Sequence, residues 1–497
     1  MTGEELDRIG AIFKNKTVFI SGATGFLGKV LIEKLLRVTE VRRLYLLVRT
    51  KKGLNPKERL QDIFKHVLFS RLRQERPESI NKCQIITGDV LEKDLGISLS
   101  DRKIIQNEVD FIVHSAASTR FDDTIEYAVR MNTLGTHYML NLAKECRKLQ
   151  LFVHISTAFA FPKEKVLLDK AYPPPADSKE VLDIILKENS TPADQNLLNM
   201  YYGDCPNTYT FSKALAEDFV NKEMDNLPVI IVRPSVVVPT YQEPLPGYFN
   251  NLQSPMGIFV GACKGVIRSV HIDSKANANM IPADSVINLL LVTAWDYVAN
   301  KSNHRFCNMS VPQEDLIITW ESLVEHGKGT VKTVPFNQIL WYPEGIMTKY
   351  KLWHYIHVFL FQLIPAIFID LLLLCLGYKP ILLAINQRLL KGQEMFDYFT
   401  THRWIVNVKY ALKLRTYLNE VERKQYNLDA RNVNIGKYME DCVLYARRHI
   451  FHETDDRLPA ARRNIKIFYV LDRTIKFAFF AYIFYYIYRK LFVAANF

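Results

Sequence analysis

Short apolar segments alternate with longer amphipathic segments through the first half of the chain. The apolar segments lie at 17–20, 44–48, 85–87, 109–113, 151–155 and 229–232. After the first of them, apolar residues recur at spacings of three and four from Leu27 to Leu36, which predicts a helix, and 56–74 has a more polar helical pattern. Short strands that are apolar on both faces and alternate with helices are typical of a parallel, doubly wound α/β sheet.

Two regions depart from this alternation. Residues 161–208 contain no clear strand pattern and include the consecutive prolines Pro173–Pro175, so we expect an insertion there. After about residue 345, long helical patterns replace the strands. We therefore expect an α/β domain at 1–340, a mainly helical domain at 341–460 and a tail at 461–497.

Residues 358–376 form the longer of two apolar stretches in the C-terminal part, and they reach the length of a membrane-spanning helix. They contain Pro365 and one charged residue, Asp370. A carboxylate in the middle of a span costs free energy unless it is paired. The stretch therefore fits either a membrane span or a buried or re-entrant apolar hairpin of a helical domain.

Residues 477–488 form the second stretch, which is rich in Phe and Tyr and lies between Lys476 and Arg489-Lys490. Aromatic residues beside cations suit the headgroup region of a membrane. The wider segment 457–490 carries eight Lys and Arg against one Asp, which favours an anionic cytosolic leaflet. We expect the tail to associate with a membrane.

The composition is that of a folded protein with an anionic partner. Of 497 residues, 48% are hydrophobic and 23% are charged, which excludes a disordered chain. The net charge is +12, from 64 basic and 52 acidic residues. Because the positive charge is spread out and no basic-aromatic groove motif occurs, we do not expect nucleic acid as the partner. The seven cysteines form no CxxC or CxxH pair, so neither a disulfide framework nor a metal site is expected.

The first strand runs into a glycine-rich loop, SGATGFLG, that opens the first helix. In such a loop the first glycine permits a tight turn, the second lets the backbone approach a pyrophosphate, and the third lets helix and strand pack closely. Free N–H groups and the helix dipole then attract the pyrophosphate to the helix N-terminus. The sequence therefore predicts a dinucleotide site, with candidate contacts at Gly22, Thr24, Gly25, Phe26, Leu27 and Gly28.

The end of the second strand indicates which dinucleotide is bound. NAD-binding proteins place an acidic residue there for the ribose 2′-hydroxyl, but this chain has Arg49, followed by Lys51 and Lys52. Because a guanidinium pairs well with a 2′-phosphate, NADPH is favoured; a solvated loop cation is the alternative role of Arg49. Later strand ends complete the candidate cofactor site with Asp89 and Val90 near the adenine and Ala116 beside the cofactor.

Tyr209 and Lys213 form a YxxxK pattern on a predicted helix from Thr208 to Met224. A spacing of four residues places both side chains on one helix face. A neighbouring ammonium stabilises a phenolate and lowers the tyrosine pKa from about 10 toward the range of acid–base catalysis. The lysine can also hold the nicotinamide ribose. The pattern recurs at Tyr297 and Tyr486, so the place of Tyr209 between the last two strands distinguishes it; an ordinary buried aromatic is its alternative role.

Thr157 and Asn132 complete the candidate catalytic set. Thr157 directly follows the strand at 151–155, where its hydroxyl can reach a substrate carbonyl. Asn132 lies in MNTLGT, at a helix position suited to proton relay. The alternatives are a strand-end cap for Thr157 and a helix-surface residue for Asn132.

The motifs GATGFLG, GDV, HSAAS, HISTAFA, YTFSK and VRPS occur in this order and, with the GxxGxxG spacing, resemble the extended short-chain dehydrogenases. That resemblance implies a Rossmann sheet. The helical C-terminal region makes nearly the whole chain similar to the fatty acyl-CoA reductases of animals, the male-sterility-type reductases. Its pattern runs from His357 through Pro365-Ala366 and Asp370 to Gly377-Tyr378-Lys379-Pro380.

The resemblance implies NADPH-dependent reduction of a long-chain fatty acyl-CoA to a primary alcohol, through a hemithioacetal and an aldehyde. Tyr209 and Thr157 would polarise the thioester carbonyl, and Lys213 and Asn132 would complete the catalytic set. Many relatives carry Ser where this chain has Thr157, and the hydroxyl is kept. Residues 1–340 would be the reductase domain, with the insertion on its substrate side.

Two other functions compete with this interpretation: a membrane-bound extended short-chain dehydrogenase for a sterol or other lipid carbonyl, and a non-enzymatic NADP-binding scaffold. Arg49 argues against an NAD-dependent steroid oxidant, and a scaffold does not need the catalytic set. The expected partners are long-chain acyl-CoA and membrane lipid, with a homodimer left open. We expect a cytosolic catalytic domain on the endoplasmic reticulum, with the peroxisome and the lipid droplet as alternatives.

Overall fold

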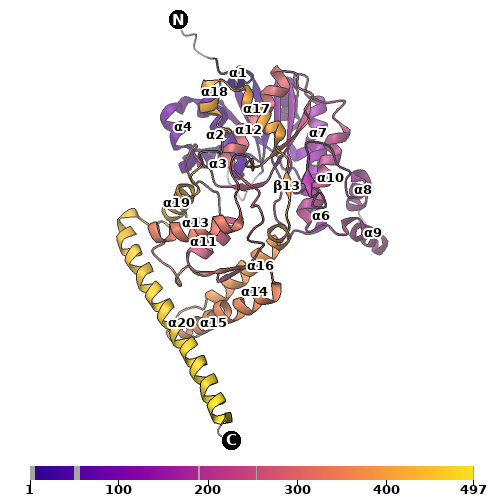
Figure 1. The fold of residues 1–497 in the computed structure, drawn as a ribbon. Helices are drawn as coiled ribbons and strands as arrows, with labels where there is room; N and C mark the ends of the chain where they lie inside the picture. Colours follow the sequence, from indigo (N-terminus) through magenta and orange to yellow (C-terminus); the bar gives the residue numbers. More distant parts are fainter. Residues whose placement is uncertain (1–5, 50–55, 188–190, 253–254, 496–497) are drawn as a thin grey trace. The chain divides into compact units, whose positions relative to one another are not determined.

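The computed structural model describes residues 6–49, 56–187, 191–252 and 255–495 (Figure 1). The chain divides into two compact units. The first unit consists of Met1–Asn250, Asn277–Ile318 and Arg403–Val433, and the second of Asn251–Ala276, Thr319–His402 and Asn434–Phe497.

A seven-stranded parallel sheet forms the centre of the first unit, as the alternating pattern predicts. The strand order is β11-β7-β5-β4-β1-β2-β3. The chain builds outward from β1 to β3 and then crosses to β4 on the other side of β1, so the order reverses between β1 and β4. The strands are β1 (Thr17–Ser21), β2 (Arg43–Val48), β3 (Cys83–Thr87), β4 (Phe111–His114), β5 (Leu151–Ile155), β7 (Val229–Pro234) and β11 (Phe306–Met309).

Helices cover both faces of this sheet, which is why β1 and β5 are buried along their whole length. On one face α5, α7 and α10 contribute Ile105, Met139 and Val220 to a core shared with Phe19 and Phe152 of the sheet. On the other face α2 packs against α12. These helices are α2 (Phe26–Val38), α5 (Leu99–Glu108), α7 (Gly135–Glu145), α10 (Thr208–Lys222) and α12 (Ala283–Ala299).

The six predicted strands are confirmed, and β11 is the strand that the pattern missed. Its sequence, FCNM, contains a cysteine and an asparagine, so it does not show the continuous apolar run that identified the other strands. Asn308 can be fully buried there because its amide donates hydrogen bonds to two backbone carbonyls. The predicted helix at 56–74 is interrupted near His66 and forms α3 (Pro56–Lys65) and α4 (Ser70–Glu75).

The remaining elements of the first unit lie around this core. In the described residues of the insertion at 161–208, two helices form, together with a two-residue strand that pairs with 405–406. The elements are α1 (Arg8–Ala11), α6 (Ile125–Val129), β6 (Val166–Leu167), α8 (Ser178–Leu186), α9 (Pro192–Tyr202), β8 (Val236–Val238), β10 (Met280–Pro282), β13 (Ile405–Val406), α17 (Lys409–Tyr417) and α18 (Glu420–Gln425).

The division into units differs from the three consecutive segments expected at 1–340, 341–460 and 461–497. Residues 403–433 belong to the first unit, because Glu422 is buried in an ion pair with Arg8 at 2.7 Å and Arg415 pairs with Asp315. Such contacts join residues that are far apart in the sequence, so no local composition change marks the boundary.

The second unit is mainly helical, with one small parallel pair of strands. A π-helical turn at Phe359–Leu363 joins α14 and α15 into one helix, Lys351–Cys375. Within the described residues, this is the helix that is long and apolar enough to cross a membrane. The elements are α11 (Pro255–Cys263), β9 (Ser269–His271), α13 (Trp320–Thr333), β12 (Ile346–Thr348), α14 (Lys351–Val358), α15 (Ile364–Cys375), α16 (Leu382–Thr401), α19 (Ile435–Tyr445) and α20 (Leu458–Ala495).

The last helix, α20, has two different halves. In its first half Ala461, Ile465 and Asp472 are buried, and Asp472 accepts a hydrogen bond from Trp341 Nε1 at 2.6 Å. From 477 to 491 every side chain is exposed. The part of the expected tail without protein cover therefore begins after Lys476 rather than at 461.

A buried ion pair fixes the insertion to the sheet. Arg233 of β7 is fully buried and pairs with Glu217 of α10 at 2.7 Å, and it also donates to the carbonyl of Leu168 at 3.1 Å. Its guanidinium lies over the rings of Phe161 and Phe306. One charged side chain thus holds a helix, an edge strand and the insertion together.

Glu217→Ala should destabilise the first unit strongly, because it leaves a buried guanidinium without a counter-charge at a cost of about 3 kcal/mol. We expect the midpoint of thermal unfolding, followed by circular dichroism, to fall by roughly 5–10 °C. Glu145→Ala removes an exposed pair with Arg102 and is the matched control, with an expected cost of at most about 1 kcal/mol. Equal shifts in the two variants would contradict this role of Arg233.

Candidate functional site

The glycine loop lies where the strand order reverses, at the carboxyl ends of β1 and β4. Gly22 has φ +70°, and a Cβ there would lie 2.7 Å from the backbone nitrogen of Ala116. A Cβ on Gly28 would lie 2.2 Å from the carbonyl oxygen of Gly22. Both positions therefore require glycine, one for the turn beside β4 and one for the packing of α2 on β1.

The N-terminus of α2 is suited to an anion. Its N-cap is Gly25, which has no side chain to cap the first N–H groups of the helix. Thr24, Phe26 and Leu27 beside them are half-buried. A dinucleotide pyrophosphate fits this arrangement of glycine backbone and helix N-terminus.

The other candidate cofactor residues lie at the carboxyl ends of neighbouring strands. Val90 is buried against Gly135, and the Asp89 carboxylate accepts the N–H of Leu91 at 3.2 Å. Arg49 is exposed at the end of β2, and its carbonyl accepts a hydrogen bond from Arg59. Lys51 and Lys52 lie outside the described residues.

Tyr209 and Thr157 meet at the edge of this site. Tyr209 stands in the first turn of α10, whose N-cap is Asn207, and Thr157 follows β5. The Thr157 hydroxyl accepts the N–H of Phe159 at 3.2 Å and is hydrogen-bonded to the Tyr209 phenol. Burial raises the pKa of Tyr209 to about 12, and the bond to Thr157 opposes that rise. Tyr209 is therefore a protonated phenol near neutral pH, and its ring stacks on Phe121 at 5.8 Å.

Lys213 lies one turn further along α10 and is almost fully buried. Its ammonium donates to the carbonyl of Ile155 at 2.7 Å and lies 3.5 Å from His154 Nε2. Burial lowers the pKa of Lys213 to about 8, although Glu217 acts in the opposite direction. The Lys213 ammonium thus contacts the backbone at the end of β5. The sequence predicted that this ammonium lowers the pKa of Tyr209, but burial raises that pKa.

Asn132 is buried, so the surface role considered for it is wrong. It stands in a π-helical turn, Arg130–Leu134, and its amide donates to the carbonyl of Ser118 at 3.0 Å and to Ser212 Oγ at 2.9 Å. The Ser212 hydroxyl in turn donates to the carbonyl of Tyr209 at 3.1 Å. Asn132 therefore contacts α10 through Ser212.

A chain of buried hydrogen bonds continues from Asn132 to the glycine loop. Thr136 Oγ1 donates to the carbonyl of Asn132 at 2.6 Å and accepts from His114 Nε2 at 3.0 Å. Ser21 Oγ lies 2.7 Å from His114 Nδ1 and accepts the N–H of Ala116 at 3.2 Å. Burial lowers the pKa of His114 to about 3, so the ring is neutral and suits one accepting and one donating nitrogen.

Sequence reasoning missed His154, Ser212 and Phe121 as neighbours of the candidate catalytic residues. His154 lies in register with His114 on the neighbouring strand, and the two rings are 5.6 Å apart. A histidine inside an otherwise apolar strand was the available signal for His154. Ser212 and Phe121 have no comparable signal, because helix packing and a loop bring them to Asn132 and Tyr209.

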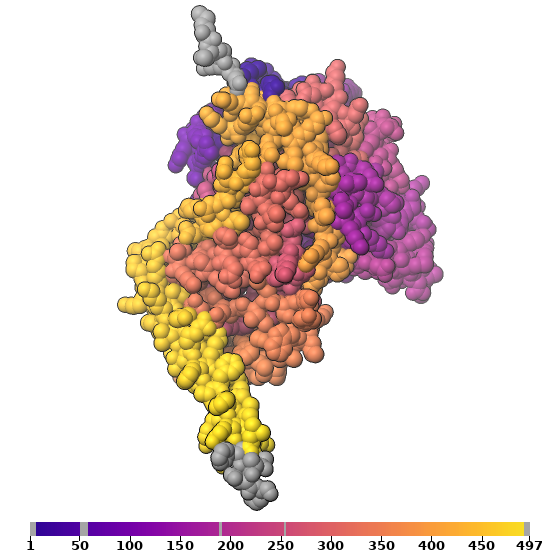
Figure 2. Space-filling model, in the orientation of Figure 1, coloured from indigo at the N-terminus to yellow at the C-terminus, as the bar shows by residue number. Residues whose placement is uncertain are grey.

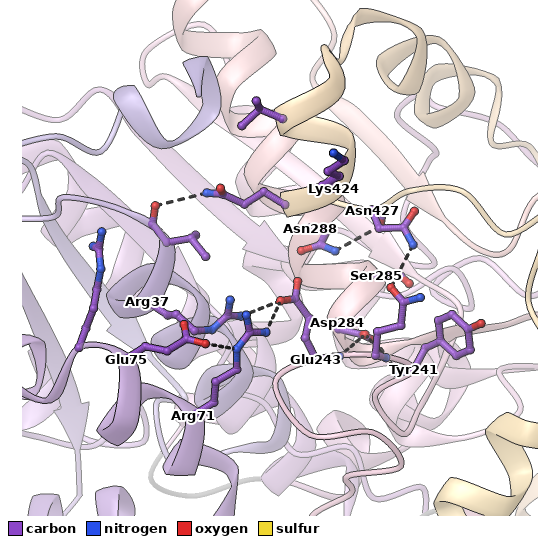
Figure 3. A pocket seen from close by; sticks show the side chains of 15 residues that line it. Arg37, Arg71, Glu75, Tyr241, Glu243, Asp284, Ser285, Asn288, Lys424 and Asn427 are labelled. Carbon is purple, nitrogen blue, oxygen red and sulfur yellow. Dashed lines mark hydrogen bonds and ion pairs between the residues drawn. The ribbon is translucent and has the colours of Figure 1, made fainter. Parts of the chain in front are cut away.

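A cavity of about 690 Å³ in the first unit is a separate feature (Figure 3). It is lined by the C-terminal end of α2, the end opposite the glycine loop, and by charged side chains of both signs. Arg37 and Arg71 both pair with Glu243, and Asp284 accepts the backbone N–H of Glu243. We interpret the charged residues around this cavity as an ion-pair network that holds the loop around Glu243 against α2.

Comparison with known proteins gives matches over most of the chain. Residues 20–290 match a family model described as male sterility protein, and residues 361–453 match a second model with that description. Fatty acyl-CoA reductase 1 of Rattus norvegicus is 33% identical over 464 residues, which are 91% of this chain and 88% of that protein. Fatty acyl-CoA reductase wat of Drosophila melanogaster is 32% identical over 94% of this chain and 90% of its own length.

Solved structures confirm the fold. The terminal R domain of the myxalamid PKS-NRPS pathway superposes with a TM-score of 0.58 at 17% identity, covering 89% of this chain and 92% of that one. The reductase domain of a nonribosomal peptide synthetase from Mycobacterium tuberculosis gives 0.57 at 18% identity, covering 89% and 96%. The sheet, the glycine loop, the Thr157–Tyr209 pair and these matches lead to one conclusion: the chain belongs to the fatty acyl-CoA reductase family, of the male sterility type.

Proposed function

We propose that this protein reduces a long-chain fatty acyl-CoA to the primary fatty alcohol with NADPH. The observation that carries the proposal is the pair of hydroxyls at Thr157 and Tyr209, hydrogen-bonded to each other at the strand ends that also carry the glycine loop. The names of the relatives supply the substrate class, and Arg49 favours a 2′-phosphate.

NADPH, when bound, supplies one hydride to the acyl carbon in each of two reductions, first of the thioester and then of the aldehyde. Tyr209 donates its proton to the oxygen that becomes negative as the carbonyl is reduced. Thr157 donates a second hydrogen bond to that oxygen and stabilises the charge. After the first reduction the product is a hemithioacetal, in which the C–S bond breaks, coenzyme A leaves as the thiol and the aldehyde remains.

Lys213 holds positive charge near this site below a pH of about 8, which is the pKa that burial gives it. In this role it orients the nicotinamide ribose and stabilises the phenolate left on Tyr209. Asn132 keeps α10 in place through Ser212 and offers a relay for the returning proton.

We also propose that the protein associates with a membrane, with the first unit on the cytosolic side and the endoplasmic reticulum as the first membrane to examine. The apolar helix 351–375 and the uncovered turns of α20 after Lys476 support this proposal. A substrate whose acyl tail partitions into lipid would then be met at the membrane surface.

Tyr209→Phe tests the proposed chemistry, because it removes the proton donor and keeps the ring. Membranes containing the protein should convert palmitoyl-CoA and NADPH to hexadecanol, identified by mass, and Tyr209→Phe should lower kcat on the order of 10²- to 10⁴-fold. Tyr127→Phe, at an exposed tyrosine of α6, is the matched control and should change little. Near-normal turnover by Tyr209→Phe, or turnover of NAD and a sterol by the parent protein, would contradict the proposal.

Gly28→Ala tests the cofactor loop, since the added Cβ would overlap the carbonyl oxygen of Gly22. We expect NADPH binding, measured by fluorescence titration, to weaken at least about tenfold as the loop shifts. Gly329→Ala is the control, because a Cβ in that helix meets no atom within 4 Å. Unchanged binding by Gly28→Ala would place the dinucleotide elsewhere.

Arg49→Glu tests the choice between the two nicotinamide cofactors. Replacing a phosphate partner with a ribose partner should raise the KM for NADPH by about tenfold and lower the preference over NADH, with kcat little changed. Arg43→Glu, at the opposite end of β2, controls for the change in net charge. If the ratio of the two KM values stays constant, the 2′-phosphate contacts other residues, and Lys51 and Lys52 are next to be substituted.

A further inference from the structure

The helix 351–375 attaches to the second unit along one stripe of side chains. On that stripe Gln362 accepts the backbone N–H of Arg268 at 3.1 Å, and His354 Nδ1 lies 2.9 Å from Ser269 Oγ. The buried positions recur every four residues, at His354, Val358, Gln362, Ala366 and Asp370.

The rest of the same helix is apolar and exposed. Between Lys351 and Lys379 the sequence has one charged residue, Asp370, and it is buried. An exposed apolar surface of this extent is rare on a soluble monomer and marks an interaction site. Exposed fractions run from 39% to 71% at Phe359, Leu360, Phe361, Ile364, Ile367, Phe368, Leu371, Leu372, Leu374 and Leu376.

Asp370 explains how a charge is accommodated in this helix. Its carboxylate accepts the backbone N–H groups of Ile381, Leu382 and Leu383 at 2.8–3.0 Å. These groups belong to the first turn of α16 and its approach, so Asp370 caps the N-terminus of the next helix. The capping contact requires the chain to turn back within 376–381, which makes α14, α15 and α16 a helical hairpin.

Both legs of this hairpin are attached to the same strand, β9. The outgoing leg contacts it through His354 and Ser269, and the returning leg through Thr400, whose hydroxyl donates to the carbonyl of His271 at 3.0 Å. Because both ends of the hairpin are held at β9, they lie on the same side of any membrane surface that the hairpin contacts. The returning helix also carries four charged residues, Arg388, Lys391, Glu394 and Asp397, which do not suit a second span.

From these contacts we infer that the α14–α16 hairpin lies in one leaflet of a lipid bilayer and does not cross it. This inference deepens the proposed membrane association and rests on it. The exposed half of α15 would be buried at the boundary of headgroups and acyl chains, as in other interfacial amphipathic helices. The polar stripe, including Asp370, stays within the protein.

Two observations favour lipid over a protein as the partner that covers the exposed apolar face of α15. The residues that bracket the apolar face, Lys349, Lys351 and Lys379, are all basic and complement anionic headgroups. The same unit carries a second lipophilic segment, the exposed Phe and Tyr side chains of α20 after Lys476, and Figure 2 shows these last yellow turns projecting from the unit. A unit with two such segments, each flanked by cations, fits a membrane surface.

A natural cysteine of the chain offers a labelling site that tests whether α15 contacts lipid. Cys375 is exposed at the end of α15, and Cys205 is half-buried. The other five cysteines are buried. The full-length Cys205→Ser protein can therefore carry a bimane fluorophore at Cys375 on vesicles of phosphatidylcholine and phosphatidylserine.

Lipids brominated on their acyl chains should quench the fluorophore at Cys375 roughly twofold or more, because that side of α15 faces the leaflet. A fluorophore placed by Leu99→Cys, with Cys205 and Cys375 replaced by Ser, is the control, since Leu99 is 81% exposed in the first unit and should not be quenched. Absence of quenching at Cys375 would overturn the inference and mean that protein, such as a second copy of the chain, covers this face.

A second labelling experiment distinguishes a hairpin in one leaflet from a span. In the background without Cys205 and Cys375, Lys379→Cys should react with a membrane-impermeant maleimide added outside sealed vesicles as fully as after the vesicles are opened. Protection of that cysteine until the vesicles are opened would place it on the far side and overturn the inference. Neither measurement uses turnover, so failure here and failure of the proposed acyl-CoA reduction are read independently.

Discussion

The candidate site depends on a continuous chain of buried hydrogen bonds that connects the glycine loop to α10, the helix of Tyr209 and Lys213. It runs from Ser21 at the end of β1 through His114 and Thr136 to Asn132, and from there to Ser212 on α10. Every one of these side chains is buried, so an unsatisfied member would cost the full desolvation of a polar group. Because each group is paired, the chain fixes the positions of the loop and of Tyr209 relative to each other.

Burial acts on the two central titratable groups in opposite directions. It raises the pKa of Tyr209 and lowers that of Lys213, because low polarity disfavours a phenolate and an ammonium alike. The proton is therefore held on the phenol, as the proposed role of Tyr209 as general acid requires. Thr157 opposes the rise in the pKa of Tyr209 through a hydrogen bond. In the proposed reaction this bond links the proton donor to the group that stabilises the substrate oxygen.

In the second unit a carboxylate lies within an apolar helix. Asp370 satisfies its charge with three N–H groups of the following helix, so the residue that would oppose a membrane span becomes the residue that closes a hairpin. Asp472 has a similar role in α20. Trp341 and Arg268 bind its carboxylate, and this contact lies at the end of the packed half of the helix, before the exposed half. In both helices the buried acid belongs to the part that packs on the protein, and apolar side chains outside that part stay exposed.

Sequence by itself determined the features that short-range chemistry controls. Six strands, the helix after the glycine loop and the helix of Tyr209 and Lys213 follow from local patterns, because burial on both sheet faces and the backbone freedom of glycine leave direct signals. Only the tertiary structure decided the rest: the place of β11, the return of 403–433 to the first unit, the burial of Asn132 and the capping role of Asp370. Each of these depends on partners brought close by folding, and a hydrogen bond or ion pair between distant residues leaves no periodicity in the chain that makes it.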